Sequence, residues 1–320
     1  MTILVIGDAN ADLSAAVGRF PFEGDDAPLG ALEWGSGGTG VNVTVALGRI
    51  GAAARLLARV GADPAADVAL RMARDAGADL STVQVDPATA TGLCFSVVSP
   101  GGERTFFSFR GANQALEPPA NLDALLEGVR WVEVGGHALL EGRQRTTTEG
   151  LIGAAAERGV PVSLDLCLPL MRARRDQVLA LLPTLEVLFA NELELALLLG
   201  EGTKEPAELH DALRRLEGPR TTVAKLGPRG SVVASGGHVC VVPAYAVEAV
   251  DTNGCGDAFI AGFIHARLAG MGIETCARVG NALGALTATG PGAADAVPDR
   301  ARLRAFLEGG GLSAELRSML

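Results

Sequence analysis

The sequence predicts a three-layer α/β/α fold built on a doubly wound, mostly parallel sheet. Short apolar runs rich in β-branched residues recur along most of the 320 residues. Helical patterns separate these runs, and the helices end at a glycine or shortly before one, as helices commonly do. This alternation of strand and helix is typical of βαβ units in a parallel sheet.

The elements follow one another in a regular order. We expect strands at residues 3–7, 55–60, 131–134, 160–164, 187–190 and 221–225. Between them we expect helices at residues 39–50, 65–76, 146–158 and 208–216, followed by two consecutive Gly/Ala-rich helices at 257–268 and 275–287.

Two segments, residues 11–34 and 91–110, interrupt this order. Within the second, Leu93–Val98 and Thr105–Phe109 flank a Pro-Gly-Gly turn, which predicts a β-hairpin. We expect the two segments to form a small β lid over a ligand site, although a surface hairpin without a function gives the same pattern. The large nucleotide- and substrate-binding α/β domain then comprises residues 1–10, 35–90 and 111–320.

Composition excludes several classes of function. The net charge of −10 leaves no basic footprint for nucleic acid or an anionic membrane. No apolar run approaches the roughly 20 residues that span a bilayer, and no basic segment precedes the first strand, so we expect a cytoplasmic protein. The five cysteines contain no Cys-x-x-Cys pair and indicate neither a disulfide framework nor a zinc site.

The most informative motif lies at the start of the helix expected at 257–268. Gly254 and Gly256 allow the backbone to approach a ligand closely, and the amides of residues 254–257 point outward from the helix start. Such amides stabilise the charge on a phosphoryl group during transfer. Asp257 beside them could accept the proton of an attacking hydroxyl, although a tight turn with a favourably placed acidic residue has the same pattern.

A second glycine cluster opens the helix at 39–50. It reads Gly35-Ser36-Gly37-Gly38-Thr39-Gly40-Val41-Asn42 and ends in an amide side chain. Two glycine-rich helix starts predict the two halves of one cleft.

Together these motifs resemble the ribokinase-like (PfkB) carbohydrate kinases. Residues 37–42 match the Gly-Gly-x-Gly-x-Asn signature of that family, and residues 251–257 match its Asp-Thr-x-Gly-Ala-Gly-Asp signature. The likeness runs in family order along nearly the whole chain. It also includes Asn10-Ala11-Asp12, Gly111-Ala112-Asn113, Asn191-Glu192-Leu193-Glu194 and Lys225-Leu226-Gly227-Pro228-Arg229-Gly230.

The resemblance implies an ATP-dependent kinase that phosphorylates a hydroxyl of a small sugar or sugar acid of the ribose, fructose or 2-keto-3-deoxygluconate type. Asp257 would be the base, and the amides of Gly254, Cys255 and Gly256 would form the anion hole. The implied substrate residues are Asn10, Asp12, Gly37, Gly38, Thr39 and Asn42, and His137 is added because it follows a core strand. Asn191 and Glu194 would organise Mg²⁺ through water, and ATP would lie against Asn191, Lys225, Gly227, Gly230, Gly256 and Asn281.

Four further expectations accompany the resemblance. Binding of K⁺ at Asp251 and the carbonyl of Asn253 is left open. Cys255 stands where the family usually has Ala, and a thiol near a helix N-terminus suggests sensitivity to oxidation. Thr39 replaces the Lys that is usual in ribokinases, which weakens the case for ribose. Exposed lid strands predict a homodimer.

Other classes of function stay as alternatives. A nucleoside kinase of the adenosine or pseudouridine type is the nearest rival, and a non-catalytic ligand-binding protein could share the fold. The segment 35–40 formally satisfies the dinucleotide fingerprint of NAD-dependent oxidoreductases, but it does not follow a β-branched strand. The sequence contains no Gly-Lys-Ser/Thr phosphate loop and no Gly-x-Ser-x-Gly hydrolase elbow.

Overall fold

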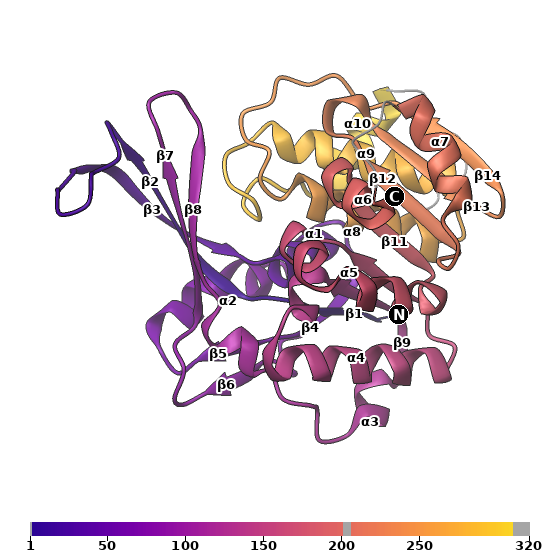
Figure 1. Cartoon of the computed structure of the whole chain (residues 1–320), viewed down its shortest axis with the longest axis horizontal. Coiled ribbons are helices and arrows are strands. Elements are labelled where there is room, and N and C mark those ends of the chain that lie inside the picture. Colours follow the sequence, from indigo (N-terminus) through magenta and orange to yellow (C-terminus); the bar gives the residue numbers. More distant parts are fainter. Residues whose placement is uncertain (1, 201–205, 310–320) are drawn as a thin grey trace.

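A central sheet of eight strands organises the molecule (Figure 1). The structure is a computed structural model and describes residues 2–200 and 206–309. The strand order is β14-β13-β12-β11-β10-β9-β1-β4, and all neighbours from β12 to β4 are parallel, whereas β13 and β14 are antiparallel additions at one edge. The strands are β1 (Thr2–Ile6), β4 (Ala53–Leu57), β9 (Val129–Gly135), β10 (Val162–Asp165), β11 (Val187–Asn191), β12 (Thr221–Lys225), β13 (Ser231–Ser235) and β14 (His238–Val242).

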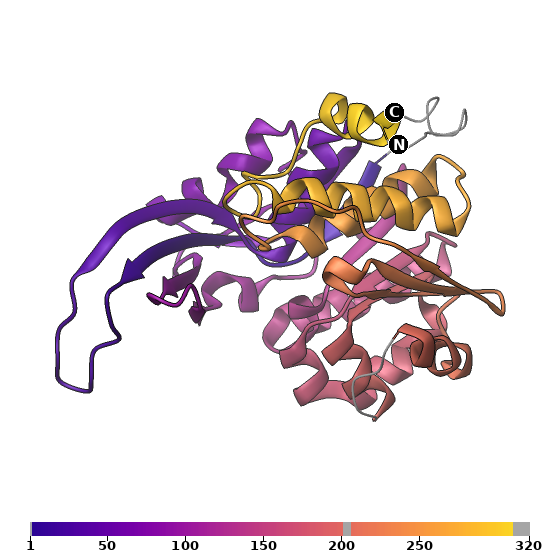
Figure 2. The same ribbon diagram turned by 90° about the horizontal axis from the view of Figure 1, so that it is seen from above.

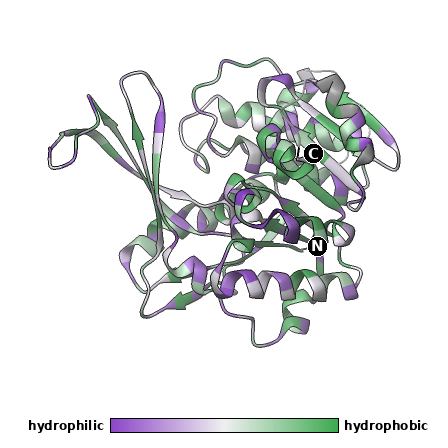
Figure 3. Cartoon of the chain, viewed as in Figure 1, coloured by the Kyte–Doolittle hydropathy of each residue, from purple (hydrophilic) through white to green (hydrophobic). Residues whose placement is uncertain are grey.

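Helices cover both faces of this sheet, so the predicted three-layer fold is confirmed. Successive residues of a strand point to opposite faces, and in β1 Ile3 and Val5 pack into one core while Leu4 and Ile6 pack into the other. Figure 3 shows the resulting apolar colour along the central strands. The first core is closed by α1 (Thr39–Arg49), α8 (Cys255–Leu268), α9 (Ile273–Ala288) and α10 (Arg300–Gly309), and the second by α3 (Leu122–Leu126), α4 (Gly142–Glu157), α5 (Leu168–Leu181), α6 (Glu192–Leu199) and α7 (Pro206–Arg215).

A separate four-stranded sheet projects from one side of the molecule, as Figures 1 and 2 show. Its order is β3-β2-β7-β8, and β7 and β8 form the antiparallel hairpin that the sequence predicts. The helix α2 (Pro64–Asp75) packs against its base. The strands are β2 (Asn10–Val17), β3 (Leu29–Gly37), β7 (Gly92–Val98) and β8 (Arg104–Phe109), and we call them the small sheet.

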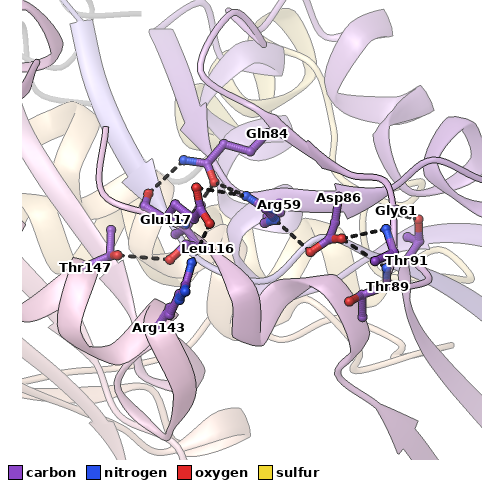
Figure 4. A network of polar contacts seen from close by, with 11 residues as sticks. Arg59, Gly61, Gln84, Asp86, Thr89, Thr91, Leu116, Glu117, Arg143 and Thr147 are labelled. Carbon is purple, nitrogen blue, oxygen red and sulfur yellow. Dashed lines mark hydrogen bonds and ion pairs between the residues drawn. The ribbon is translucent and has the colours of Figure 1, made fainter. Parts of the chain in front are cut away.

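The prediction of a single strand at residues 55–60 is wrong. The chain leaves the central sheet after β4, and β5 (Arg59–Gly61) pairs instead with β6 (Gln84–Asp86). Polar contacts fix this pair: Arg59 Nε lies 3.1 Å from Asp86 Oδ2, and the side-chain oxygen Oε1 of Gln84 accepts hydrogen bonds from Arg59 Nη1 and from the Glu117 amide (Figure 4). The apolar run at residues 55–60 is continuous in the sequence, but the contacts of Arg59 with distant residues divide it between two sheets.

Among the described residues, no helix is long and apolar enough to cross a membrane.

Candidate active site

The site forms where three parallel strands end beside the start of α8. Asp165, Asn191 and Lys225 are the last residues of β10, β11 and β12. Carboxyl ends of parallel strands are the usual place for ligands in such sheets. A cavity of about 730 Å³ opens between the turn that precedes α8 and the small sheet. Predicted residues among those that line it are Asp12, Asn42, Asp251, Asn253 and Gly254.

The two glycine-rich motifs meet at Asp257. Asn42 Nδ2, in the first turns of α1, donates a hydrogen bond of 2.8 Å to Asp257 Oδ2, in the first turn of α8. Gly254 precedes α8 with a φ of 72°, and a Cβ there would lie only 2.9 Å from the backbone of Ala293. Glycine is therefore required at this close approach, and the predicted halves of the cleft lie side by side.

Asp257 has the protonation properties of a general base. Removal from water raises the pKa of its carboxyl from 3.8 to about 7, and the nearby charge of Asp165 acts in the same direction. The hydrogen bond from Asn42 and the Lys225 ammonium oppose this shift in pKa. A carboxylate with a pKa near the working pH can accept a proton from a hydroxyl and later release it.

Asp12, one of the predicted substrate residues, lies on β2. A Cβ at Gly37 would lie 2.1 Å from the Asp12 carboxyl group, so glycine at 37 makes room for it. Asp12 Oδ1 is buried and has no hydrogen-bond partner among the described residues, and burial raises the pKa of Asp12 to about 7. Asn10 is held by Asn113, whose Nδ2 donates to its side-chain oxygen over 2.8 Å. Asp12 therefore has an oxygen available for a hydroxyl donor.

Lys225 lies beneath the proposed anion hole. Its Nζ contacts Asp165 Oδ1 over 2.5 Å and lies 3.4 Å from where a Cβ of Gly256 would be. Burial disfavours the ammonium, but Asp165 and Glu194 outweigh that effect, and the pKa of Lys225 is raised. The lysine is therefore a fixed positive charge next to the amides that begin α8.

Asn191 and Glu194 form a capping box at the start of α6. The Glu194 amide donates to Asn191 Oδ1 over 2.9 Å, and the Asn191 amide donates to Glu194 Oε2 over 2.7 Å. The Glu194 side chain is buried. Burial and the nearby Asp165 raise the pKa of Glu194 to about 7.

Sequence reasoning missed two acidic residues of this cluster. Asp165 is the last residue of β10, and Glu133 lies in β9. Burial raises the pKa of both carboxyls, and Glu133 Oε1 has no hydrogen-bond partner in the described part of the chain. Their spacing in the sequence is irregular, and their only signal is a carboxylate inside an apolar strand.

Asp251 is already engaged by the protein. Its Oδ1 accepts hydrogen bonds from Arg104 Nη1 over 2.6 Å and from the Asn253 amide over 2.9 Å, and its Oδ2 accepts one from the Gly292 amide over 3.0 Å. The carboxylate whose role in K⁺ binding was left open therefore already has a positively charged partner, the Arg104 guanidinium.

The Cys255 thiol is not activated. Burial raises its pKa to about 11, and the charges of Asp251 and Asp257 add to the effect. A thiolate is the reactive form of cysteine, so burial opposes the sensitivity to oxidation that the position near a helix N-terminus suggests.

The predicted residues not yet placed lie outside the lining of the cavity, as do Asp257 and Lys225. Asn281 Nδ2 donates to the carbonyls of Val242 and Pro243, each over 3.1 Å, and so holds the loop after β14. His137 follows β9, and burial lowers its pKa. The other residues of this group are Gly38 and Thr39 at the start of α1 and Gly227 and Gly230 after β12.

Comparisons with known proteins identify the family. A family model described as pfkB family carbohydrate kinase matches residues 2–300. An ATP-dependent ribose-1-phosphate kinase of Halopiger xanaduensis is 32% identical over 305 residues, which cover 95% of this chain and 97% of that protein. A deoxyribokinase of Salmonella typhi is 26% identical, with coverages of 96% and 99%. The structure of Arabidopsis thaliana ribokinase complexed with ribose and ATP matches with a TM-score of 0.86 at 25% identity, covering 97% of this chain and 99% of that one.

The chain therefore belongs to the PfkB family of carbohydrate kinases, and it is an ATP-dependent phosphotransferase that acts on a hydroxyl of a small sugar. The predicted resemblance and enzyme class are confirmed.

Proposed function

We propose that this PfkB-family kinase uses Asp257 as its base and the amides of Gly254, Cys255 and Gly256 as its anion hole. The observation that carries the proposal is the hydrogen bond between Asn42 and Asp257, which joins the two signature motifs at a carboxyl whose pKa is about 7. A sugar hydroxyl placed between Asp12 and Asp257 can donate its proton to Asp257. Its oxygen then bonds to the γ-phosphorus of ATP as the bond to the β–γ bridging oxygen breaks, and ADP leaves.

Charge balance in the cluster supports a divalent cation near Glu194. Lys225 faces three carboxyl groups, those of Asp165, Glu194 and Asp257, and the pKa of each carboxyl is raised. The described residues contain no group of three or more His, Cys, Asp or Glu side chains that could hold a metal ion by themselves. Mg²⁺ suits such a site because it keeps several waters and binds phosphate oxygens. Asn191 and Glu194 would hold it through water, and it would neutralise charge on the phosphates.

A sugar that already carries a phosphate is the second candidate substrate. Arg71 on α2 lines the cavity and makes no hydrogen bond or ion pair with the described residues. The adjacent Met72 amide donates to Ser36 Oγ on β3, which fixes this turn of the helix close to the strand that faces Asp12. An unpaired guanidinium at the sugar end of the cavity suits a phosphate group, and the relative from Halopiger xanaduensis acts on ribose 1-phosphate.

We also infer that the small sheet closes over the sugar and pairs with a second copy of the chain. Large apolar side chains stay exposed on its strands, and a surface of this kind usually serves an interface. A Phe107→Ser variant that remains dimeric in analytical ultracentrifugation would argue against this surface as the interface. The exposed residues are Leu29, Leu32, Trp34, Phe106, Phe107 and Phe109.

A coupled ADP-release assay tests the proposal. Ribose, deoxyribose, fructose, 2-keto-3-deoxygluconate, ribose 1-phosphate and adenosine are each offered with Mg·ATP, and the product is identified by mass spectrometry. We expect one sugar or sugar phosphate to be consumed and adenosine to be ignored. Consumption of adenosine alone would favour the nucleoside kinase, and phosphorylation that survives Asp257→Asn would remove the proposed base.

A further inference from the structure

An ion pair joins the small sheet to the turn that begins α8. Arg104 is the first residue of β8, and its Nη1 lies 2.6 Å from Oδ1 of Asp251, which is 147 residues away in the sequence. Both side chains line the cavity, and that of Asp251 is only 8% exposed. Figure 1 shows the β7–β8 hairpin extending beside the loops that flank α8. The pair therefore bridges the mouth of the site between two parts of the molecule.

Asp251 also holds together the two loops that shape the anion hole. Its Oδ1 accepts from the Asn253 amide, one residue before Gly254, and its Oδ2 accepts from the Gly292 amide. Gly254 in turn packs directly against Ala293. The carboxylate thus links both loops, and its geometry sets how the amides at the start of α8 are aimed.

The charge of Arg104 makes a bound cation at Asp251 unnecessary. An arginine stays protonated at any physiological pH, and a second cation on the same carboxylate would lie close enough to the guanidinium to be repelled. Both oxygens of Asp251 accept hydrogen bonds, from Arg104 and Asn253 at Oδ1 and from Gly292 at Oδ2, as the oxygens of an ionised carboxylate do.

We propose that Arg104 is a positioning residue for phosphoryl transfer: from the small sheet, its guanidinium neutralises Asp251 and holds the turn at residues 251–254 in its active shape, in place of a monovalent cation. This inference rests on the proposed role of the Gly254–Gly256 amides as the anion hole. It adds that the catalytic turn is completed only when the small sheet lies against it, because Arg104 belongs to that sheet.

The test compares wild-type enzyme with Arg104→Ala and Arg104→Lys, with K⁺ or choline as the only monovalent cation at constant ionic strength. We expect wild-type kcat to differ by less than about twofold between the two salts. Arg104→Ala should lose about tenfold or more in kcat in choline, as expected when one partner of a partly buried charge pair is removed. K⁺ should restore part of this loss because the small cation can then reach Asp251. Arg104→Lys should retain more activity than Arg104→Ala.

Arg19→Ala is the matched control, because it removes another 2.6 Å ion pair of the small-sheet region, the pair with Asp25, without touching the site. It should leave kcat and its salt response unchanged. Activation of the wild-type enzyme by K⁺ of fivefold or more would overturn the proposal. A kcat of Arg104→Ala in choline that equals the wild-type value would overturn it as well. The wild-type result stands even if Arg104→Ala fails to fold. Failure of the proposed function would be seen separately, as a wild-type enzyme that phosphorylates no sugar.

Discussion

Replacement of Asp257 by Asn should abolish proton acceptance with little change in shape, because an amide oxygen can still accept the hydrogen bond from Asn42. General-base catalysis contributes about 10²- to 10⁴-fold in rate, which corresponds to about 3–5 kcal/mol at 1.36 kcal/mol per decade. We therefore expect kcat to fall by that factor while the KM for ATP stays within about threefold, since binding does not require the base. Asp67→Asn, at an exposed carboxylate of α2, is the control for removal of a negative charge.

The same substitution should not lower stability at neutral pH. The folded-state pKa of Asp257 is about 7 against an ordinary value of 3.8. The folded protein therefore holds this proton more tightly than the unfolded chain does, and the destabilisation due to this carboxyl grows from about pH 4 to about pH 7 and is constant above. An asparagine side chain is uncharged at every pH, so it does not destabilise the folded protein in this way. A thermal midpoint for Asp257→Asn at pH 8 that is equal to or above that of the wild type is the expected result.

The pH profile offers a second readout of the same group. The base must be ionised to accept a proton, so wild-type kcat/KM should rise with pH and level off above about pH 7. Turnover by Asp257→Asn within a few-fold of the wild-type rate, or a wild-type profile that is flat from pH 5 to 8, would refute the assignment of the base.

Three other substitutions test the surroundings of the site. Lys225→Met should cost about 3 kcal/mol in urea unfolding because it leaves Asp165 as a buried, uncompensated charge, and the double variant Lys225→Met/Asp165→Asn should recover most of that loss. If the loss of stability in the double variant equals the sum of the losses in Lys225→Met and Asp165→Asn, the two residues are not coupled and the reasoning is wrong. Gly37→Ala should raise the KM for the sugar about tenfold or more, because its methyl group overlaps the Asp12 carboxyl; an unchanged KM would speak against Asp12 as a substrate ligand. Cys255→Ala should leave kcat unchanged, and iodoacetamide at pH 7 should not inactivate the wild-type enzyme through this thiol.

The layered core could be predicted because its signals are local. The strands β1, β9, β10, β11 and β12 are short apolar runs that must be buried on both faces, and the periodic helices between them have matching apolar sides. The meeting of Asn42 with Asp257 was predictable for a related reason. Both follow glycine-rich helix starts that serve the same cleft.

What the sequence did not predict depends on long-range partners. The chain leaves the central sheet at Arg59, where the side chain binds Asp86 and Gln84. The hairpin of β13 and β14 was missed although Gly236 and Gly237 mark its turn. The ion pair between Arg104 and Asp251 has no local signature at all, since an arginine beside a hairpin turn is ordinarily a solvated residue.

One part of the site belongs to helices that are packed in the core, and the other part belongs to the small sheet. Asn42 and Asp257 belong to α1 and α8, which pack against each other in the core, so the contact between them is fixed by buried apolar side chains. Asp12 and Arg104 belong to β2 and β8 of the small sheet. The proposed base is thus preorganised before the sugar binds, whereas the proposed substrate ligand and the proposed support of the anion hole depend on where the small sheet lies. A change that shifts this sheet should therefore alter the KM for the sugar and the dependence of kcat on Arg104. It should leave the pKa of Asp257 in the sugar-free enzyme unchanged.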